Sequence, residues 1–199
     1  MNSNSLFGLL PSEIAELIKP FGARAFTARQ IAEWMYVNRV YQFDAMSNLP
    51  KQLREQLTEA FPVTLVPYSD VQVSKDGTKK YLFEFSNGRS VETAVIPDDD
   101  RLTVCVSSQA GCRFGCRFCA TGNIGFHGNL TAGEILNQLM AIDECEQITN
   151  IVYMGMGEPL DNWDEVYKSL EILTSDKMMN MGAGRITVST IGIHEHFSD

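Results

Sequence analysis

Cys112-Arg-Phe-Gly-Cys116-Arg-Phe-Cys119 places three cysteines within eight residues of this 199-residue sequence. The cysteines are spaced four and then three residues apart, so their thiolates can converge from one tight loop. Thiolates are soft ligands that suit Zn²⁺ or an iron–sulfur cluster, whereas a disulfide framework needs an even number of cysteines at longer spacing. Structural zinc sites and ferredoxin clusters normally use four protein ligands. Three thiolates around a four-iron cluster leave one iron open to bind substrate, which favours catalysis over a structural or electron-transfer role.

Composition places the chain among ordinary globular proteins. It is 44% hydrophobic and 21% charged, which is enough for one or two small domains with their own cores. No apolar run approaches the roughly 18 residues of a membrane span, and residues 1–6 lack the basic start and apolar stretch of a signal peptide. Five cysteines, three of them clustered, suit a reducing compartment. We therefore expect a cytoplasmic protein with no membrane partner.

Charge is distributed unevenly along the sequence. A net charge of −9 and a pI of about 4.8 argue against a nucleic acid partner when taken over the whole chain. The net charge is zero over residues 1–67, zero over residues 68–130 and −9 over residues 131–199. Most of the late carboxylates fall in stretches with helical periodicity, where they are typical of a solvated face. The charge therefore leaves RNA open as a partner.

Residues 1–67 have the periodicity and the start signals of helices. Ser12 precedes the first apolar stripe, and Pro50 begins the third. Thr27 with Gln30 predicts a capping box at the start of the second. We expect a small unit of three helices, whose composition fits many roles, including merely covering the next domain. Its basic residues either form a patch that faces RNA or lie on solvated helix faces; they are Arg24, Arg29, Arg39, Lys51 and Arg54.

Residues 68–97 change to the period of two that is typical of strands. Asp76-Gly77 and Asn87-Gly88, strong hairpin signals, separate three alternating runs. The sequence therefore predicts a β-meander. Glu92 lies on its last strand and faces opposite to Val91 and Thr93. It is either an exposed strand carboxylate or a functional group turned away from the core.

Strands alternate with helices from residue 98 onward, which predicts a parallel sheet with right-handed crossovers. The expected strands are residues 102–107, 150–153 and 185–190. One expected helix begins at the capping box of Thr131 and Glu134, and the next is expected to be capped by Asp161. Ligands of such sheets gather at the carboxyl ends of the strands. The cysteine loop, Gly157-Glu158 and Ser189-Thr190 each end or follow a strand, so we expect them to converge on one site.

The cysteine spacing resembles the signature of the radical S-adenosylmethionine (radical SAM) superfamily. Further segments, in the same order, resemble one family within it, the RlmN-type RNA methyltransferases that methylate C2 of adenine. These segments are Cys105-Val-Ser-Ser-Gln-Ala-Gly-Cys112, Gly125-Phe126, Asn129-Leu-Thr131, Met154-Gly-Met-Gly-Glu-Pro159 and Ser189-Thr190. The resemblance implies an α/β fold. In it a helical accessory domain (residues 1–67) and a β-meander extension (residues 68–97) precede the first half of a partial (β/α)6 radical SAM barrel (residues 98–199).

The resemblance also implies cofactors, substrates and residue roles. The three cysteines of the loop would hold a 4Fe–4S cluster whose open iron binds S-adenosyl-L-methionine (SAM), and Gly157, Glu158 and Ser189 would bind SAM. Glu92 would remove the proton from adenine, and Cys105 would resolve a protein–RNA adduct by forming a disulfide. The implied partners are ribosomal RNA, transfer RNA and a flavodoxin-like electron donor. By residue type alone, Cys105 on an apolar strand is a core residue.

Other interpretations fit the same residues. The loop could be a zinc-binding module in which His127, eight residues after Cys119, is the fourth ligand. The chain could also be an inactive truncated paralogue. Arg113 and Arg117 either contact phosphate or only solvate the loop.

The sequence contains about three of the six strand–helix units that the resemblance implies. The family's methyl-carrying cysteine is expected beyond residue 199, and Cys145, expected on a helix, fits a small buried residue better. We therefore expect an N-terminal portion of such an enzyme that does not methylate RNA alone. His194 and His196 are two residues apart and would not share a helix face, so a metal role there has little support.

Overall fold

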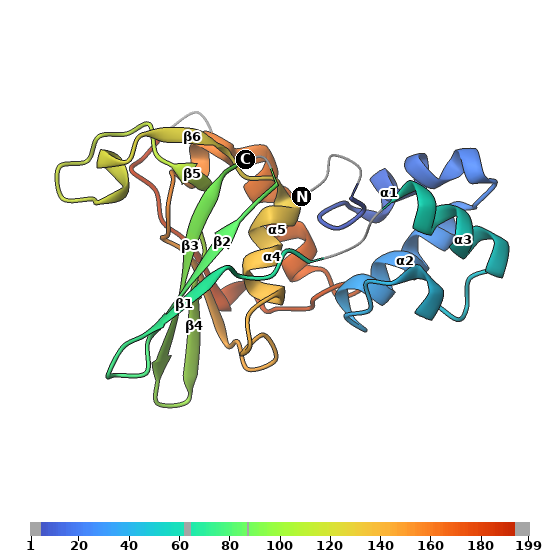
Figure 1. The fold of residues 1–199 in the computed structure, drawn as a ribbon, viewed down its shortest axis with the longest axis horizontal. Helices are drawn as coiled ribbons and strands as arrows, with labels where there is room; N and C mark the ends of the chain where they lie inside the picture. Colours follow the sequence, from blue (N-terminus) through green and yellow to red (C-terminus); the bar gives the residue numbers. More distant parts are fainter. Residues whose placement is uncertain (1–4, 62–64, 87, 194–199) are drawn as a thin grey trace.

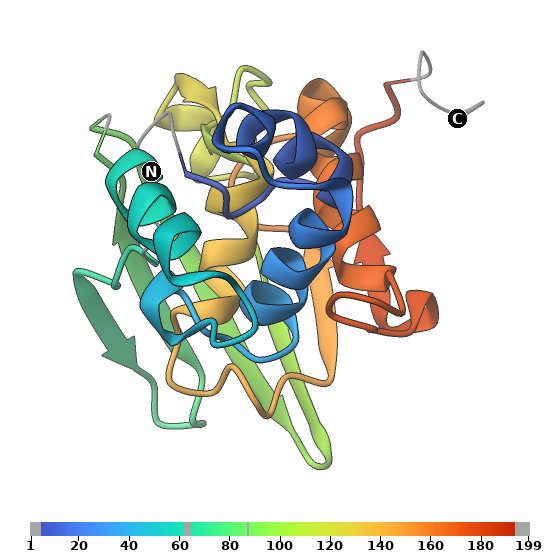
Figure 2. The same ribbon diagram turned by 90° about the vertical axis from the view of Figure 1, so that its right-hand side faces the viewer.

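A computed structural model describes residues 5–61, 65–86 and 88–193 of the chain. It is a mixed α/β molecule, as the sequence predicted. Its main sheet has six strands, in the order β1 (Asp70–Val73), β2 (Lys79–Glu84), β3 (Ser90–Asp98), β4 (Arg101–Cys105), β7 (Asn150–Tyr153) and β8 (Ile186–Val188) (Figure 1). Helices α4 (Ala132–Met140) and α5 (Trp163–Thr174) cover one face of this sheet, and three N-terminal helices pack on their far side, as the rotated view also shows (Figure 2). No helix within these described ranges has both the length and the apolar composition to cross a bilayer.

Three helices form the N-terminal part, as expected, but two begin earlier than the start signals suggested. Their bounds are Pro11–Ile18 (α1), Ala25–Tyr36 (α2) and Lys51–Ala60 (α3). At α1 the carboxylate of Glu13 accepts a hydrogen bond from the Leu10 amide at 2.7 Å, so Ser12 is not the cap. The Thr27 capping box is also wrong. The backbone is extended at Arg24 and already helical at Ala25, and the Thr27 amide donates to the Arg24 carbonyl at 2.8 Å.

This helical unit shares one hydrophobic core with the sheet. The backbone of Gly8 lies directly against the backbone of Gly133 in α4. At the edge of the contact, Glu13 Oε1 lies 2.8 Å from Lys168 Nζ on α5. The helical unit is therefore docked on the two helices that cover the sheet.

The β-meander is present, and a fourth antiparallel strand extends it. Its strands are Asp70–Val73 (β1), Lys79–Glu84 (β2), Ser90–Asp98 (β3) and Arg101–Cys105 (β4). Val91 and Thr93 are buried and Glu92 is exposed, as the alternation predicted. Asn87 of the second expected turn lies outside the described residues, as do His194 and His196.

Beyond β4 the sheet is parallel, which confirms the predicted alternation. Strands β4, β7 and β8 run parallel to one another, and β5 pairs with β6 in a separate two-stranded sheet. These elements are β5 Gln109–Gly111, β6 Phe126–Asn129, α4 Ala132–Met140, β7 Asn150–Tyr153, α5 Trp163–Thr174 and β8 Ile186–Val188. Short 3-10 turns lie at Lys19–Phe21, Phe43–Ala45, Thr121–Asn123, Pro159–Asn162 and Ala183–Arg185.

The two helix starts predicted in this region had different outcomes. The capping box of α4 is confirmed, because the Glu134 amide donates to Thr131 Oγ1 at 3.2 Å and the Thr131 amide donates to Glu134 Oε2 at 2.9 Å. The cap expected at Asp161 is wrong. Asn162 is the residue before α5, and the Asp161 carboxylate instead bonds to Gln109 at 2.6 Å.

Candidate cluster and cofactor site

The segments that follow β4, β7 and β8 meet at one edge of the sheet. The three strands are parallel, so their carboxyl ends lie on the same side. The Met156 amide donates to Ser107 Oγ at 2.9 Å, which joins the segment after β7 to the segment after β4. Thr190 Oγ1 donates to Glu158 Oε1 at 2.5 Å, which joins the segment after β8 to that after β7. The expected convergence of these segments is therefore present in the fold.

The cysteine loop runs between β5 and β6. All three of its thiols are free and partly buried, and the Cys112 amide donates to the Gly125 carbonyl at 3.0 Å at the base of the loop. Burial raises the pKa of Cys112, and the neighbouring Cys119 and Cys116 raise it further by smaller amounts. The backbone N–H of Gly122 lowers the pKa of Cys119 and favours its thiolate.

This donor set fits an iron–sulfur cluster better than a zinc site. Three soft thiols stand on one short loop, and thiolates are the ligands that such clusters use. His127, the proposed fourth zinc ligand, is exposed, and its Nε2 lies 3.2 Å from the Ile124 carbonyl oxygen. In the part of the chain that the structure describes, no three His, Cys, Asp or Glu side chains are already arranged around a metal position.

Glu158 is buried at this edge, with 3% of its surface exposed. Its carboxylate accepts hydrogen bonds from the Leu160 amide at 3.1 Å, the Thr190 hydroxyl at 2.5 Å and the Ile191 amide at 2.9 Å. A carboxylate has about four acceptor positions, so roughly one remains for a ligand such as an ammonium group. Because Thr190 and Ile191 follow β8, their hydrogen bonds to Glu158 also hold the segment after β8 in place.

Gly157 allows the turn after β7 to pack closely against Gln109 of β5. Its φ is +100°, and a Cβ atom there would lie 2.6 Å from the Cβ of Gln109. Only glycine fits without displacing the neighbouring strand. Ser189, expected to bind the cofactor, is exposed, and the hydrogen bond at this strand end comes from Thr190 instead. Sequence reasoning missed Thr190, although it lies within the motif that suggested Ser189.

Glu92 and Cys105 lie on the face of the sheet that α4 and α5 leave uncovered. Ala94 pairs with Cys105, and Glu92 lies two residues before Ala94, so all three point to one face. Lys80 Nζ lies 2.9 Å from Glu92 Oε1. Burial raises the pKa of the Cys105 thiol. A cavity of about 310 Å³ adjoins Glu92; it is also lined by Leu82, Gly88, Arg89, Ser90, Val91, Ile124, His127 and Met156.

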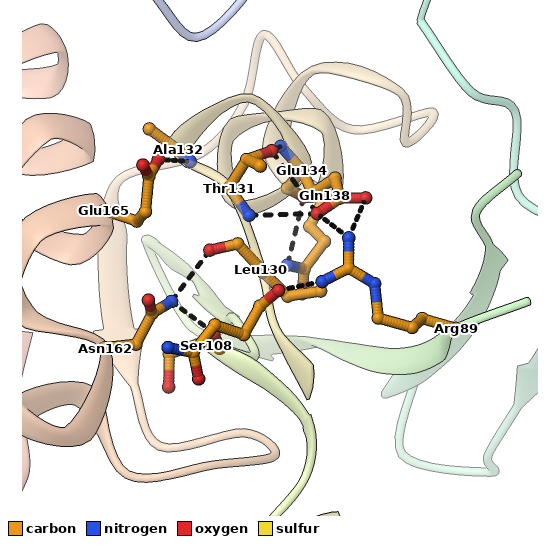
Figure 3. A network of polar contacts seen from close by, with 10 residues as sticks. Arg89, Ser108, Leu130, Thr131, Ala132, Glu134, Gln138, Asn162 and Glu165 are labelled. Carbon is orange, nitrogen blue, oxygen red and sulfur yellow. Dashed lines mark hydrogen bonds and ion pairs between the residues drawn. The ribbon is translucent and has the colours of Figure 1, made fainter. Parts of the chain in front are cut away.

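A polar network ties together the elements behind the cysteine loop (Figure 3). Arg89, just before β3, donates from Nη2 to both carboxylate oxygens of Glu134 on α4 at 2.8 Å. Asn162, just before α5, donates from Nδ2 to the carbonyls of Ser108 and Leu130, each at 2.8 Å. The meander, the two helices and the strand before the loop are thus held in one arrangement.

Cys145 lies far from this site. It is in a turn that precedes β7, not on a helix as expected, and therefore at the opposite edge of the sheet from the cysteine loop. Arg39 Nη1 lies 3.3 Å from its sulfur. All five cysteines are free thiols, so the disulfide expected of Cys105 is not supported.

The basic residues of the helical unit are partly engaged within the chain. Arg39 also pairs with Glu146 at 3.4 Å, and Arg54 donates to the Asp44 carbonyl. These contacts weaken the interpretation of the five residues as one RNA-facing patch.

Two family models match the chain. Residues 4–63 match the ribosomal RNA large subunit methyltransferase N-terminal domain, and residues 106–197 match the radical SAM superfamily. The first match covers the helical unit. The second begins directly after β4 and includes the cysteine loop and the segments after β7 and β8.

Several known proteins are similar over nearly the whole chain. A probable dual-specificity RNA methyltransferase RlmN of Porphyromonas gingivalis is 50% identical over 187 residues, which cover 94% of this chain and 55% of the relative. The protein of the same name from Geobacillus thermodenitrificans is 46% identical, with 95% of this chain and 53% of the relative covered. The crystal structure of a radical SAM methyltransferase from Sphaerobacter thermophilus matches with a TM-score of 0.82 and 42% identity, covering 94% of this chain and 56% of that one. The chain spans about half the length of the curated relatives it matches.

Proposed function

Because the chain belongs to the RlmN-type family of radical SAM methyltransferases, we propose that it supplies the cluster- and SAM-binding part of the machinery that methylates C2 of adenine in large-subunit ribosomal RNA and transfer RNA. The observation that carries this proposal is the packing of the three-thiol loop at the same sheet edge as Gly157-Glu158. Relatives at 43–50% identity are named probable dual-specificity RNA methyltransferases, which supports RNA as the substrate, and the name of the N-terminal family model supports ribosomal RNA.

The family's cofactors are a 4Fe–4S cluster and SAM, and the residues present fit both. Cys112, Cys116 and Cys119 are the cluster ligands in this proposal. Gly157 lets the backbone approach SAM closely, and the remaining acceptor position of Glu158 suits the amino group of SAM. When bound, these cofactors supply the one-electron chemistry that methylation of an electron-poor ring carbon requires.

Glu92 and Cys105 are the two groups that act on the RNA in this proposal. The cavity beside Glu92 offers room for a nucleobase, and the carboxylate is the base that removes a proton from adenine. Lys80 orients that carboxylate through their 2.9 Å contact. Cys105 lies on the same open face. After losing its proton, its sulfur would form a disulfide with the methyl-carrying cysteine, and the bond broken would be the one between that cysteine's sulfur and the carbon attached to the RNA.

We also propose the partners and the cellular location. A flavodoxin-like protein is the electron donor, because the cluster needs a one-electron reductant. The location is cytoplasmic, where a reducing environment keeps the five thiols free and both RNA substrates are present.

Anaerobic reconstitution with iron and sulfide tests the cofactor assignment. We expect the chain to bind iron as a 4Fe–4S cluster whose electron paramagnetic resonance (EPR) spectrum, recorded after one-electron reduction with dithionite, changes when SAM is added. Cys112→Ala, Cys116→Ala and Cys119→Ala should each abolish the cluster, whereas the control His127→Ala should retain it. Stoichiometric zinc without iron would contradict the proposal.

The substrate assignment needs a second assay. Residues 1–193 can be fused to the C-terminal portion of the Porphyromonas gingivalis relative and incubated with SAM, a reductant and deproteinised large-subunit ribosomal RNA. We expect 2-methyladenosine by mass spectrometry. Glu92→Gln should abolish this product while leaving cluster content unchanged. Product formation by Glu92→Gln at the unsubstituted rate would remove Glu92 from the mechanism.

A further inference from the structure

Arg113, which follows the first cysteine of the loop, forms an ion pair with Asp161 in the segment after β7. Its Nε lies 2.7 Å from Asp161 Oδ2, and its guanidinium carbon lies 4.1 Å from the centroid of the Phe126 ring. The Asp161 side chain is 19% exposed and that of Arg113 is 49% exposed. The guanidinium therefore has an anion at its edge and an aromatic ring at its face, an arrangement that suits arginine and not lysine. The sequence alone suggested only phosphate contact or solvation for this residue.

Gln109 holds the Asp161 carboxylate in place. The Gln109 side chain is fully buried, and its Nε2 donates to Asp161 Oδ2 at 2.6 Å and to Asn129 Oδ1 at 2.9 Å. Its Oε1 accepts a hydrogen bond from the Glu158 amide at 3.0 Å. One buried side chain thus connects the carboxylate that holds Arg113 to the backbone of the proposed SAM-binding turn.

The cysteine loop has large apolar side chains that are exposed and so do not pack it against the rest of the protein. Phe118, near its tip, is 93% exposed, and Ile124 at its end is 55% exposed. The base of the loop is anchored by backbone pairing of β5 and β6. The ion pair of Arg113 and Asp161 ties the loop sideways to the segment after β7.

We propose that Arg113 and Asp161 form a latch that positions the cysteine loop against Gly157-Glu158 for SAM binding. This inference rests on the proposed function. SAM must contact the open iron and the turn at Gly157-Glu158 at the same time, so its affinity depends on the distance between the two segments. The cluster depends on three thiolate ligands from the loop alone, which do not require that distance. Arg113 and Asp161 are therefore positioning residues for SAM and are not required for the cluster.

The test measures iron content, melting temperature and the SAM dissociation constant of the reconstituted chain. In Arg113→Gln and in Asp161→Asn we expect unchanged iron content and melting temperature. We expect the SAM dissociation constant to rise roughly tenfold, within the range of coupling between contacting residues. Asp161→Asn keeps an acceptor for Gln109, so this variant removes mainly the charge. The matched control is Arg117→Gln, an exposed arginine of the same loop, which should leave the dissociation constant unchanged.

The double variant distinguishes a latch from two separate effects. If the residues act only through each other, Arg113→Gln combined with Asp161→Asn should bind SAM about as weakly as either single variant. A roughly hundredfold loss in the double variant would overturn the latch, as would unchanged affinity in both single variants. Iron loss in parallel with SAM affinity would assign the pair to cluster retention instead and would also overturn it. If the unsubstituted chain binds a cluster but not SAM, the latch and the proposed function are both overturned, whereas normal SAM binding with unaffected single variants overturns the latch alone.

Discussion

Substitution of Arg89 by alanine tests whether the network in Figure 3 stabilises the fold. Arg89 donates to both carboxylate oxygens of Glu134 at 2.8 Å and also to the Asn129 carbonyl. Glu134 in turn belongs to the capping box of α4. Arg89→Ala leaves the Glu134 carboxylate buried without its cation.

The burial of the two side chains determines how far the free energy of unfolding should fall in Arg89→Ala. Removing one partner of a buried ion pair typically costs about 3–5 kcal/mol, because a charge is left in a poorly solvated place. Glu134 is 1% exposed and Arg89 is 18% exposed, and the Thr131 amide still donates to Glu134 in the variant. We therefore expect the lower end, about 3 kcal/mol. In a chain of this size each kcal/mol lowers the melting temperature by about 2–4 °C, so the shift should be about 6–12 °C.

Thermal and urea unfolding followed by circular dichroism measure this loss. Lys51→Ala is the control, because its pair with Glu55 joins side chains that are 83% and 59% exposed across 3.8 Å. Such pairs contribute about 0.5 kcal/mol or less. The double variant Arg89→Ala with Glu134→Gln should be more stable than Arg89→Ala, because a neutral amide leaves no buried charge. A loss below about 1 kcal/mol for Arg89→Ala, or a double variant less stable than the single one, would refute this reasoning.

Two further predictions concern the docking of the helical unit and the thiols. Gly8→Ala should destabilise the chain by about 2–4 kcal/mol and speed proteolysis between the helical unit and the sheet. The reason is that φ is +92° and the added Cβ would lie 2.2 Å from the Gly133 amide nitrogen; an unchanged melting temperature would contradict it. In the cluster-free chain at neutral pH, iodoacetamide should label Cys119 faster than Cys105, because the Gly122 amide lowers the pKa of Cys119 while burial raises that of Cys105. The difference should shrink as the pH rises past the ordinary cysteine pKa of about 8.5, and equal neutral-pH rates in peptide mass maps would disprove it.

Local signals in the sequence predicted most elements of this fold. Alternating residues and Asp-Gly placed the meander and left Glu92 exposed, because strand side chains alternate whatever the rest of the chain does. Thr131 and Glu134 placed the start of α4, since a capping box joins residues only three apart. Thr27 offered the same signal, but it did not mark a helix start. The backbone is extended at Arg24 and helical from Ala25, so Thr27 already lies inside the first turn of α2.

The cysteine spacing alone indicated a thiolate site for zinc or an iron–sulfur cluster, since three thiols within eight residues lie close together whatever the fold around them. The tertiary structure decided how that loop is held. Asp161 looked like a helix cap in the sequence, yet its carboxylate bonds to Gln109, 52 residues away, and to Arg113. Thr190, and not Ser189, donates to Glu158. Polar side chains in loops bond to whichever buried partner the packed strands bring within about 3 Å, and no local pattern records which segments will approach.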